Sequence, residues 1–255
     1  MVGALVGVLA GVAVLLAGCG DGDPPPVEPP ATSPPPVTGA AVRAELAARA
    51  AAASDLAGVR LYRVSSPDLP DREMVVVRAA DGSWRVDLTG GAWSGTLDIA
   101  MIGIGGQLYH CTLPTPPQPT RCVAVSGLTE ETDPRVHHLF SDWLDVLRDR
   151  SAPVAVSGAP VPEGVGGQCF SVQPSAASLV PPLDPGIYCF DSDGTLTGAQ
   201  LPLGTITLIG SDPATPDTVT LPGPVVEESP PSLVAPSPTA TPSETPTPSP
   251  VPTEG

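Results

Sequence analysis

The sequence TDPRVHHLFSDWLDVLRDRS, from Thr132 to Ser151, carries the strongest structural signal in the chain. Its large apolar side chains recur three or four residues apart, which places them on one face of a helix. These side chains are Val136, Leu139, Phe140, Trp143, Leu144 and Leu147. Asp133 is a suitable N-cap, Pro134 fits the first helical position, and Pro153 prevents much continuation. The stretch therefore predicts one amphipathic helix at the centre of the fold.

The sequence alternates like β-strand on both sides of this helix. The predicted strands are 59–65, 74–79, 84–89, 93–101, 107–112 and 121–125 before it, and 154–157, 168–173, 186–191 and 196–208 after it. Pro202 and Gly204 predict a break within the last of these. The alanine-rich segment 39–57 predicts a further helix that ends at Gly58. We expect an α+β fold: a strongly curved antiparallel sheet covered by one N-terminal and one central amphipathic helix.

Two neighbouring strands predict which face of the sheet is buried. The apolar residues on them fall on one face, and Arg85, Asp87 and Asp98 fall on the other. The apolar residues are Trp84, Val86, Leu88, Trp93, Leu97, Ile99 and Met101. This period of two is typical of an antiparallel sheet with a single buried face.

The N-terminus predicts an exported lipoprotein. Residues 1–18, MVGALVGVLAGVAVLLAG, are uncharged and apolar, as in a signal peptide. Leu16-Ala17-Gly18-Cys19 has the pattern of a bacterial lipobox, in which the signal is cleaved before Cys19 and this cysteine receives the lipid. The alternative is an uncleaved membrane anchor, although the run is short for one. Either interpretation places the protein on the extracytoplasmic face of the cell membrane.

The composition of the two ends of the chain predicts where the folded domain begins and ends. Residues 19–38 form a Pro-rich linker, and residues 222–255, rich in Pro, Ser and Thr, predict a disordered tail. The predicted domain is therefore 39–221, which holds 20 acidic residues against 11 arginines, a net charge of −9. The chain contains no lysine, and a domain this acidic would repel phosphate. We therefore expect no nucleic-acid partner; a protein partner is not indicated.

Four of the five cysteines lie within the domain, as expected for disulfides in an exported protein. Of three possible connectivities, the local one, Cys111–Cys122 and Cys169–Cys189, is the simplest. A metal site on these cysteines is disfavoured because no C-x-x-C spacing is present.

No motif predicts an enzyme or a cofactor. On a regular helix His137 and His138 would point about 100° apart, which does not favour a shared metal ion. His138 and Asp142 share a helical face, and Asp145 and Asp149 continue it; a solvated face explains all three carboxylates. Gly103-Ile104-Gly105-Gly106 lacks a following helix and predicts a hairpin turn.

The order of elements resembles the LppX/LprG family of actinobacterial envelope lipoproteins, which share a shape with the LolA carriers. The resemblance covers roughly residues 39–210. It rests on the lipobox cysteine, the leading helix, the Asp-Pro entry into the central helix, and the segment from Asp193 to Leu201. It implies a half-open β-barrel with helices over the concave side and the carriage of acylated lipids across the envelope.

Two functions follow as hypotheses. In the first, an acylated lipid binds in an apolar cavity between helix and sheet. The residues expected to face it are Val136, Leu139, Phe140, Trp143, Leu144, Leu147, Trp84, Val86, Trp93, Leu97 and Ile99. In the second, the same residues pack solidly, and the protein is a ligand-free structural, signalling or interaction lipoprotein of the envelope.

Overall fold

The computed structural model describes residues 39–176, 179 and 182–235, and within them one open antiparallel sheet of eleven strands with two α-helices. The predicted signal peptide, Cys19 and the linker lie outside the described residues. The strands before the central helix are β1 (Gly58–Ser66), β2 (Leu69–Arg78), β3 (Trp84–Ala92), β4 (Leu97–Ile104), β5 (Gln107–Thr112) and β6 (Arg121–Val125). Those after it are β7 (Val154–Ala159), β8 (Gln168–Pro174), β9 (Gly186–Phe190), β10 (Leu196–Leu201) and β11 (Gly204–Asp212).

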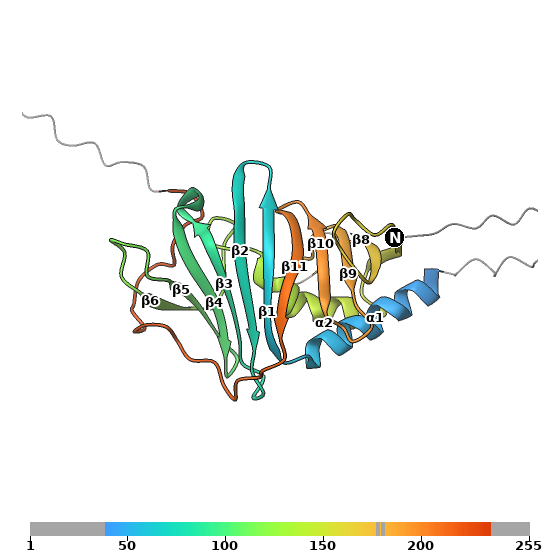
Figure 1. Cartoon of the computed structure of the whole chain (residues 1–255), viewed down its shortest axis with the longest axis horizontal. Coiled ribbons are helices and arrows are strands. Elements are labelled where there is room, and N and C mark those ends of the chain that lie inside the picture. Colours follow the sequence, from blue (N-terminus) through green and yellow to red (C-terminus); the bar gives the residue numbers. More distant parts are fainter. Residues whose placement is uncertain (1–38, 177–178, 180–181, 236–255) are drawn as a thin grey trace, which may run out of the picture. The chain divides into compact units, whose positions relative to one another are not determined.

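The sheet consists of two meanders joined in the middle. Its strand order is β6-β5-β4-β3-β2-β1-β11-β10-β9-β8-β7, so the first and last strands of the chain pair at the centre. β6 and β7 follow one another in the sequence but form the two opposite edges. The connection between them must therefore cross a face of the sheet. This connection carries the central helix, which passes behind β1 and β11 in Figure 1.

The leading helix, α1 (Gly39–Asp55), is present as predicted and packs mainly against the central helix. Leu46, Ala47 and Ala50 are buried, and Arg43 donates hydrogen bonds to the carbonyls of Val146 and Asp149. These carbonyls lie at the end of α2 (Asp142–Arg148), where a helix leaves its last carbonyl groups unpaired. Arg43 thus fastens the two helices together.

The central helix is shorter than predicted and is not continuous. Arg135, predicted to be helical, has a φ of 60°, and its N–H donates to Oδ1 of Asp133 at 2.8 Å. A 3₁₀ turn, η2 (Val136–Phe140), follows, and Ser141 leaves helical geometry (φ −133°, ψ −114°) before α2 begins. The apolar side chains are nevertheless all buried, because the two short helices turn them toward the same core. Periodicity identified the buried side chains but not the break.

The predicted start of a strand at Trp93 is wrong. β3 continues through Gly90 and Gly91 to Ala92, and the turn falls at Trp93 and Ser94, which have φ values of 50° and 56°. A side chain at Gly91 would lie 2.4 Å from Cγ1 of Ile99. These glycines therefore allow close packing within the sheet rather than forming the turn.

Several local predictions are confirmed. The disulfides Cys111–Cys122 and Cys169–Cys189 both join directly opposed residues of neighbouring strands. Gly105 and Gly106 form the turn between β4 and β5, and the predicted break near Pro202 separates β10 from β11.

The predicted end of the domain and the prediction of a single buried sheet face are both wrong. The boundary at residue 221 comes too early, because residues 222–235 are hydrogen-bonded to the domain. Val226 N–H donates to Cys122 O, and the amides of Trp93 and Ser94 donate to the carbonyls of Ser232 and Leu233. The expectation of a single buried face is also wrong, because part of the segment after β11 covers the other face of the sheet. Val219 packs on the outer face of β4–β6 and buries a second small cluster there, made up of Ala79, Ala100, Ile102, Cys111, Cys122 and Val219.

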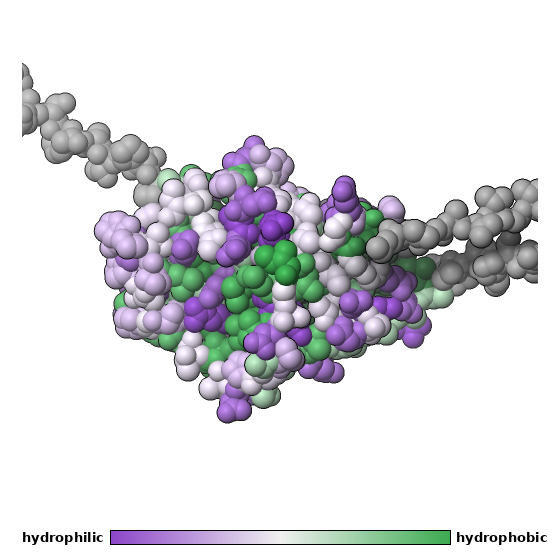
Figure 2. Space-filling view, viewed as in Figure 1, coloured by the Kyte–Doolittle hydropathy of each residue, from purple (hydrophilic) through white to green (hydrophobic). Residues whose placement is uncertain are grey.

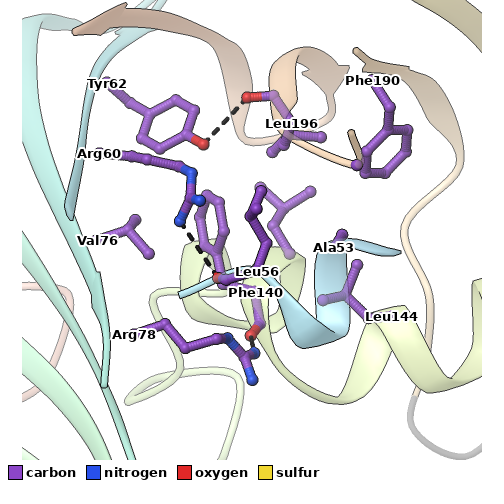
Figure 3. A pocket seen from close by; sticks show the side chains of 12 residues that line it. Ala53, Leu56, Arg60, Tyr62, Val76, Arg78, Phe140, Leu144, Phe190 and Leu196 are labelled. Carbon is purple, nitrogen blue, oxygen red and sulfur yellow. Dashed lines mark hydrogen bonds between the residues drawn. The ribbon is translucent and has the colours of Figure 1, made fainter. Parts of the chain in front are cut away.

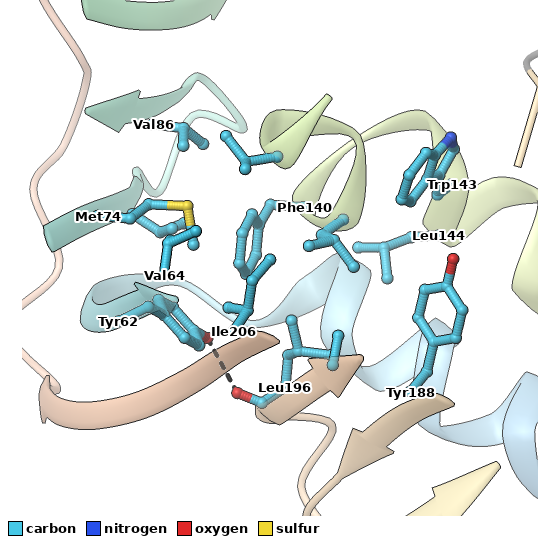
Figure 4. Packing of buried hydrophobic residues seen from close by; sticks show 14 of the residues in the cluster. Tyr62, Val64, Met74, Val86, Phe140, Trp143, Leu144, Tyr188, Leu196 and Ile206 are labelled. Atoms are coloured by element: carbon cyan, nitrogen blue, oxygen red, sulfur yellow. Dashed lines mark hydrogen bonds between the residues drawn. The ribbon is translucent and has the colours of Figure 1, made fainter. Parts of the chain in front are cut away.

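The main core lies between the helices and the opposite face of the sheet (Figure 4). Trp143, Tyr62 and Tyr188 are its largest fully buried side chains. On the face viewed in Figure 2, a group of hydrophobic side chains over the central strands is bordered by hydrophilic ones. Among the described residues, no helix is both long enough and apolar enough to cross a membrane.

Candidate functional site

A small apolar pocket lies where α1 ends, beside η2 and against β1 and β2 (Figure 3). Its volume is about 20 Å³. Its lining is aliphatic and aromatic except for two arginines. The lining residues are Ala53, Leu56, Arg60, Tyr62, Val76, Arg78, Leu139, Phe140, Leu144, Phe190, Gly194 and Leu196. This space is sufficient for about one water molecule.

Strand register positions the two arginines. Arg60 lies opposite Val76 and Tyr62 opposite Met74, so the even-numbered residues of β1 and β2 face the helices together. Arg78 continues this face at the end of β2, where it pairs with Gly58. Both guanidinium groups therefore lie at the border of the apolar core rather than on the outer face of the sheet.

Both arginines bond to backbone carbonyls around the pocket. Arg60 donates to the carbonyls of Leu56 (3.4 Å) and Ala57 (3.2 Å), which follow α1. Arg78 donates to Ser54 O at 3.1 Å and to Phe140 O. Since a guanidinium has five N–H donors, each arginine retains donors beyond these bonds. Neither forms an ion pair with a carboxylate among the described residues, although the domain is acidic.

Burial dominates the electrostatics of the pocket. It lowers the pKa of Arg78, and the neighbouring charge of Arg60 lowers it further, while the charges of Asp55 and Asp145 act in the opposite direction. Burial likewise raises the pKa of the Tyr62 phenol, whose hydroxyl donates to Leu196 O at 3.0 Å. The pocket therefore combines an apolar wall with two closely spaced positive charges, an arrangement that attracts an anion attached to an apolar group.

The eleven residues predicted to face a ligand do not lie together around the pocket. Only Leu139, Phe140 and Leu144 line the pocket. Trp84 and Trp93 are partly buried beside the core. The other six are packed within the core and do not border the pocket: Val136, Trp143, Leu147, Val86, Leu97 and Ile99.

Arg60 and Arg78 were missed in the sequence, although a signal for them was present. Each occupies an inward position of an alternating strand whose neighbours, such as Tyr62 and Val76, are apolar. A charged residue at such a position indicates either a buried polar contact or a ligand. The pocket itself could not be predicted from the sequence, because its lining comes from four segments that are far apart along the chain.

The interpretation of His138 and Asp142 as part of a solvated helical face is wrong: the helix breaks at Ser141 between them, and both are partly buried and bonded to one another. Nδ1 of His138 lies 2.6 Å from Asp142, and its Nε2 lies 2.9 Å from Asp133. Burial lowers the pKa of His138, but its bonds to both carboxylates outweigh this and raise it to about 9. Burial, together with the charge of His138, lowers the pKa of His137 to about 3. Asp145 and Asp149 are exposed, as predicted for the solvated face.

No family model and no curated protein sequence matches this chain. The likeness to LppX/LprG lipoproteins therefore remains a prediction that rests on the order of elements.

Proposed function

We propose that this chain is a lipid-anchored extracytoplasmic lipoprotein that binds an anionic, acylated lipid in the pocket at the end of α1. The observation that carries the proposal is the pair Arg60 and Arg78, which border an apolar pocket and form no direct ion pair with a carboxylate among the described residues, although Asp55, Asp145 and Asp193 lie close enough to interact with them electrostatically. The acyl chain would contact the apolar lining, and the head group would bond to the guanidinium groups. No catalytic role is proposed.

Binding requires the pocket to open, since its present volume of about 20 Å³ is too small for an acyl chain. The arginines supply a mechanism for the opening. Their bonds to Ser54, Leu56 and Ala57 hold the end of α1 against the sheet. A phosphate or carboxylate would compete for the same N–H donors, because a cationic donor bonds more strongly to an anionic oxygen than to a neutral carbonyl. Arrival of the head group would thus release α1 and admit the chain.

In this proposal the open sheet acts as a half-open barrel, and α1 is its movable cover. Burial of each CH₂ contributes about 0.8 kcal/mol, so ten carbons would contribute roughly 8 kcal/mol before the costs of association and opening. This gain is sufficient for binding only if the opening is inexpensive. Movement of α1 would also have to break the bonds of Arg43 to Val146 O and Asp149 O and uncover Leu46.

A second function is favoured by the small volume of the pocket. If the core between helices and sheet never opens, the protein is a solid, ligand-free lipoprotein that acts through contacts with other envelope components. The two functions differ in one measurable respect, which is whether an acylated lipid remains bound to the folded domain.

The first experiment is native mass spectrometry of lipid-free, non-acylated protein incubated with an envelope lipid extract. We expect a complex with one lipid that carries a negative charge. A spectrum with only the free protein would reject the proposal in favour of the second function.

The anchor is tested separately. If Cys19 is the acylated N-terminus, the substitution Cys19→Ala should move the protein from the detergent phase to the aqueous phase in a phase-partition assay. A variant that still enters the detergent phase would show that residues 1–18 act as an uncleaved anchor instead.

A further inference from the structure

Three potential metal ligands converge beside η2. The donor atoms of Asp133, His137 and His138 all lie within 4.8 Å of one another. Adjacent residues of a helix normally point apart, yet the ring centroids of His137 and His138 lie only 4.1 Å from one another. The carboxylate of Asp133 lies against both rings.

The spacing of these atoms suits a small divalent cation. Nε2 of His138 lies 2.9 Å from Oδ2 of Asp133, and Nδ1 of His137 lies 3.8 Å from Oδ1 of the same carboxylate. With bonds of about 2.0–2.1 Å, the ligands of a tetrahedral zinc ion lie about 3.4 Å apart. Each distance is within about half an ångström of this value, and the three donor atoms all lie within 4.8 Å of one another, so the side chains would have to close around an ion to complete the site.

His137 gives an independent indication of a ligand. Its side chain is only 3% exposed, and its buried Nδ1 has no hydrogen-bond partner among the described residues. An unpaired polar atom in such a position carries a desolvation cost. This atom faces the carboxylate of Asp133, where a cation bound between them would satisfy it.

His138 is oriented as a metal ligand, and binding of an ion would displace the proton that Nε2 shares with Asp133. Its Nδ1 bonds to Asp142, which leaves Nε2 directed toward Asp133 and His137. Metal-bound histidines usually bond through their other ring nitrogen to a carboxylate in this way, which fixes the ring and the tautomer. Asp142 thus has the position of an outer, orienting carboxylate.

Two tryptophans hold the rings in place. The ring of His137 stacks on Trp84 (5.9 Å between centroids) and that of His138 stacks on Trp143 (5.3 Å), each with an interplanar angle of 16°. The side chains of Asp133 and His138 are 14% and 13% exposed, so an ion can reach the site from solvent.

We propose that Asp133, His137 and His138 form a binding site for zinc or a zinc-like transition-metal ion, with Asp142 orienting His138. Two imidazoles and one carboxylate match such ions, whereas Mg²⁺ and Ca²⁺ prefer oxygen ligands alone. Three protein ligands leave one position of a tetrahedral ion open. This inference is independent of lipid binding.

The test is titration of the full-length, tag-free chain, dialysed against chelator, with Zn²⁺ in a calorimeter. We expect one ion per chain with a micromolar or lower Kd. Asp133→Asn and His137→Gln should each weaken binding at least 100-fold, and Asp142→Asn 10- to 100-fold. Asp145→Asn, which removes an exposed carboxylate of the same helix, should leave the Kd unchanged.

Binding of Co²⁺ in place of Zn²⁺, measured together with circular dichroism, distinguishes loss of the site from misfolding of a variant. A site with these ligands gives the visible absorption of four-coordinate cobalt in the wild type, and Asp133→Asn should lose it while the far-UV circular dichroism stays unchanged. The proposal is overturned if the wild type binds no Zn²⁺ at 100 μM (about one hundred times the expected Kd). It is also overturned if folded Asp133→Asn binds the ion as tightly as the wild type.

Discussion

Gly194, in the turn between β9 and β10, lies directly against the end of α1: a Cβ at this position would be 2.4 Å from the backbone nitrogen of Ala53. Its φ of +92° also disfavours a side chain. Both residues line the pocket. The contact therefore determines how closely the cover of the pocket approaches the sheet.

Gly82 offers a matched control for this contact. It has a similar φ of +84° in a similar Asp-Gly turn, but nothing lies within 4 Å of a Cβ there. Gly82→Ala should cost only the backbone strain, about 1–2 kcal/mol. Gly194→Ala should cost about 1–3 kcal/mol more because it also overpacks the contact with α1. Urea denaturation of the two variants measures the difference, and equal losses would show that α1 does not rest on this turn.

Arg78 should contribute to stability as well as to the pocket. Arg78→Met keeps the aliphatic part of the side chain but leaves the carbonyls of Ser54 and Phe140 without this donor. We expect a loss of about 1–3 kcal/mol in the free energy of unfolding. Arg63→Met is the control, because Arg63 is exposed and has only a long ion pair with Asp71, at 3.8 Å. That variant should change stability by less than about 0.5 kcal/mol; a similar loss in both would contradict the role of Arg78.

The two disulfides should contribute similar amounts. They close segments of 11 and 20 residues, for which loop-closure entropy predicts about 3 kcal/mol each. Replacing either pair by alanine should therefore lower the denaturation midpoint comparably. Peptide mapping without reduction should recover both crosslinks from protein taken from the envelope, and free thiols at these positions would refute the pairing.

His110 should make the protein less stable in acid. It is fully buried, and burial lowers its pKa from 6.5 to about 4. The unfolded chain therefore binds more protons than the folded one between these values. Stability falls as the pH drops below 6.5, and the loss is complete, at about 3 kcal/mol, below pH 4.

The variant His110→Leu isolates this term. Neither ring nitrogen of His110 has a hydrogen-bond partner among the described residues, so leucine leaves no group there unpaired. With chelator present, the variant should lose less stability than the wild type between pH 7 and pH 4. Parallel losses in the two proteins would show that His110 is not the group that titrates.

The sequence predicted the parts of the fold that depend on local pattern. Alternation identified the strands, and the spacing of Val136, Phe140 and Leu147 identified the buried face of the central segment. The pairing of β1 with β11, which joins the two meanders, depends on contacts distant in sequence and left no local signal.

The errors have two physical origins. Packing by the segment after β11 buries a second face of the sheet and fixes the turn at Trp93 through Ser232 and Leu233. Its composition of Pro, Ser and Thr resembles that of a disordered tail, so its contacts could not be anticipated. The proximity of the His137 and His138 rings was also missed, because helical periodicity predicts that adjacent side chains point apart.

The central claim is that the pocket binds an anion attached to an acyl chain, and calorimetric titration with decanoate and decanol tests it most directly. The chain is full-length and carries no lipid on Cys19. We expect decanoate to bind, Arg60→Gln to weaken its affinity about tenfold, equivalent to about 1.4 kcal/mol, and decanol binding to change less than twofold. Arg63→Gln, on the opposite face of the same strand, should leave both affinities unchanged. The claim is contradicted if wild-type protein binds neither compound, or if Arg60→Gln and Arg63→Gln bind decanoate equally well.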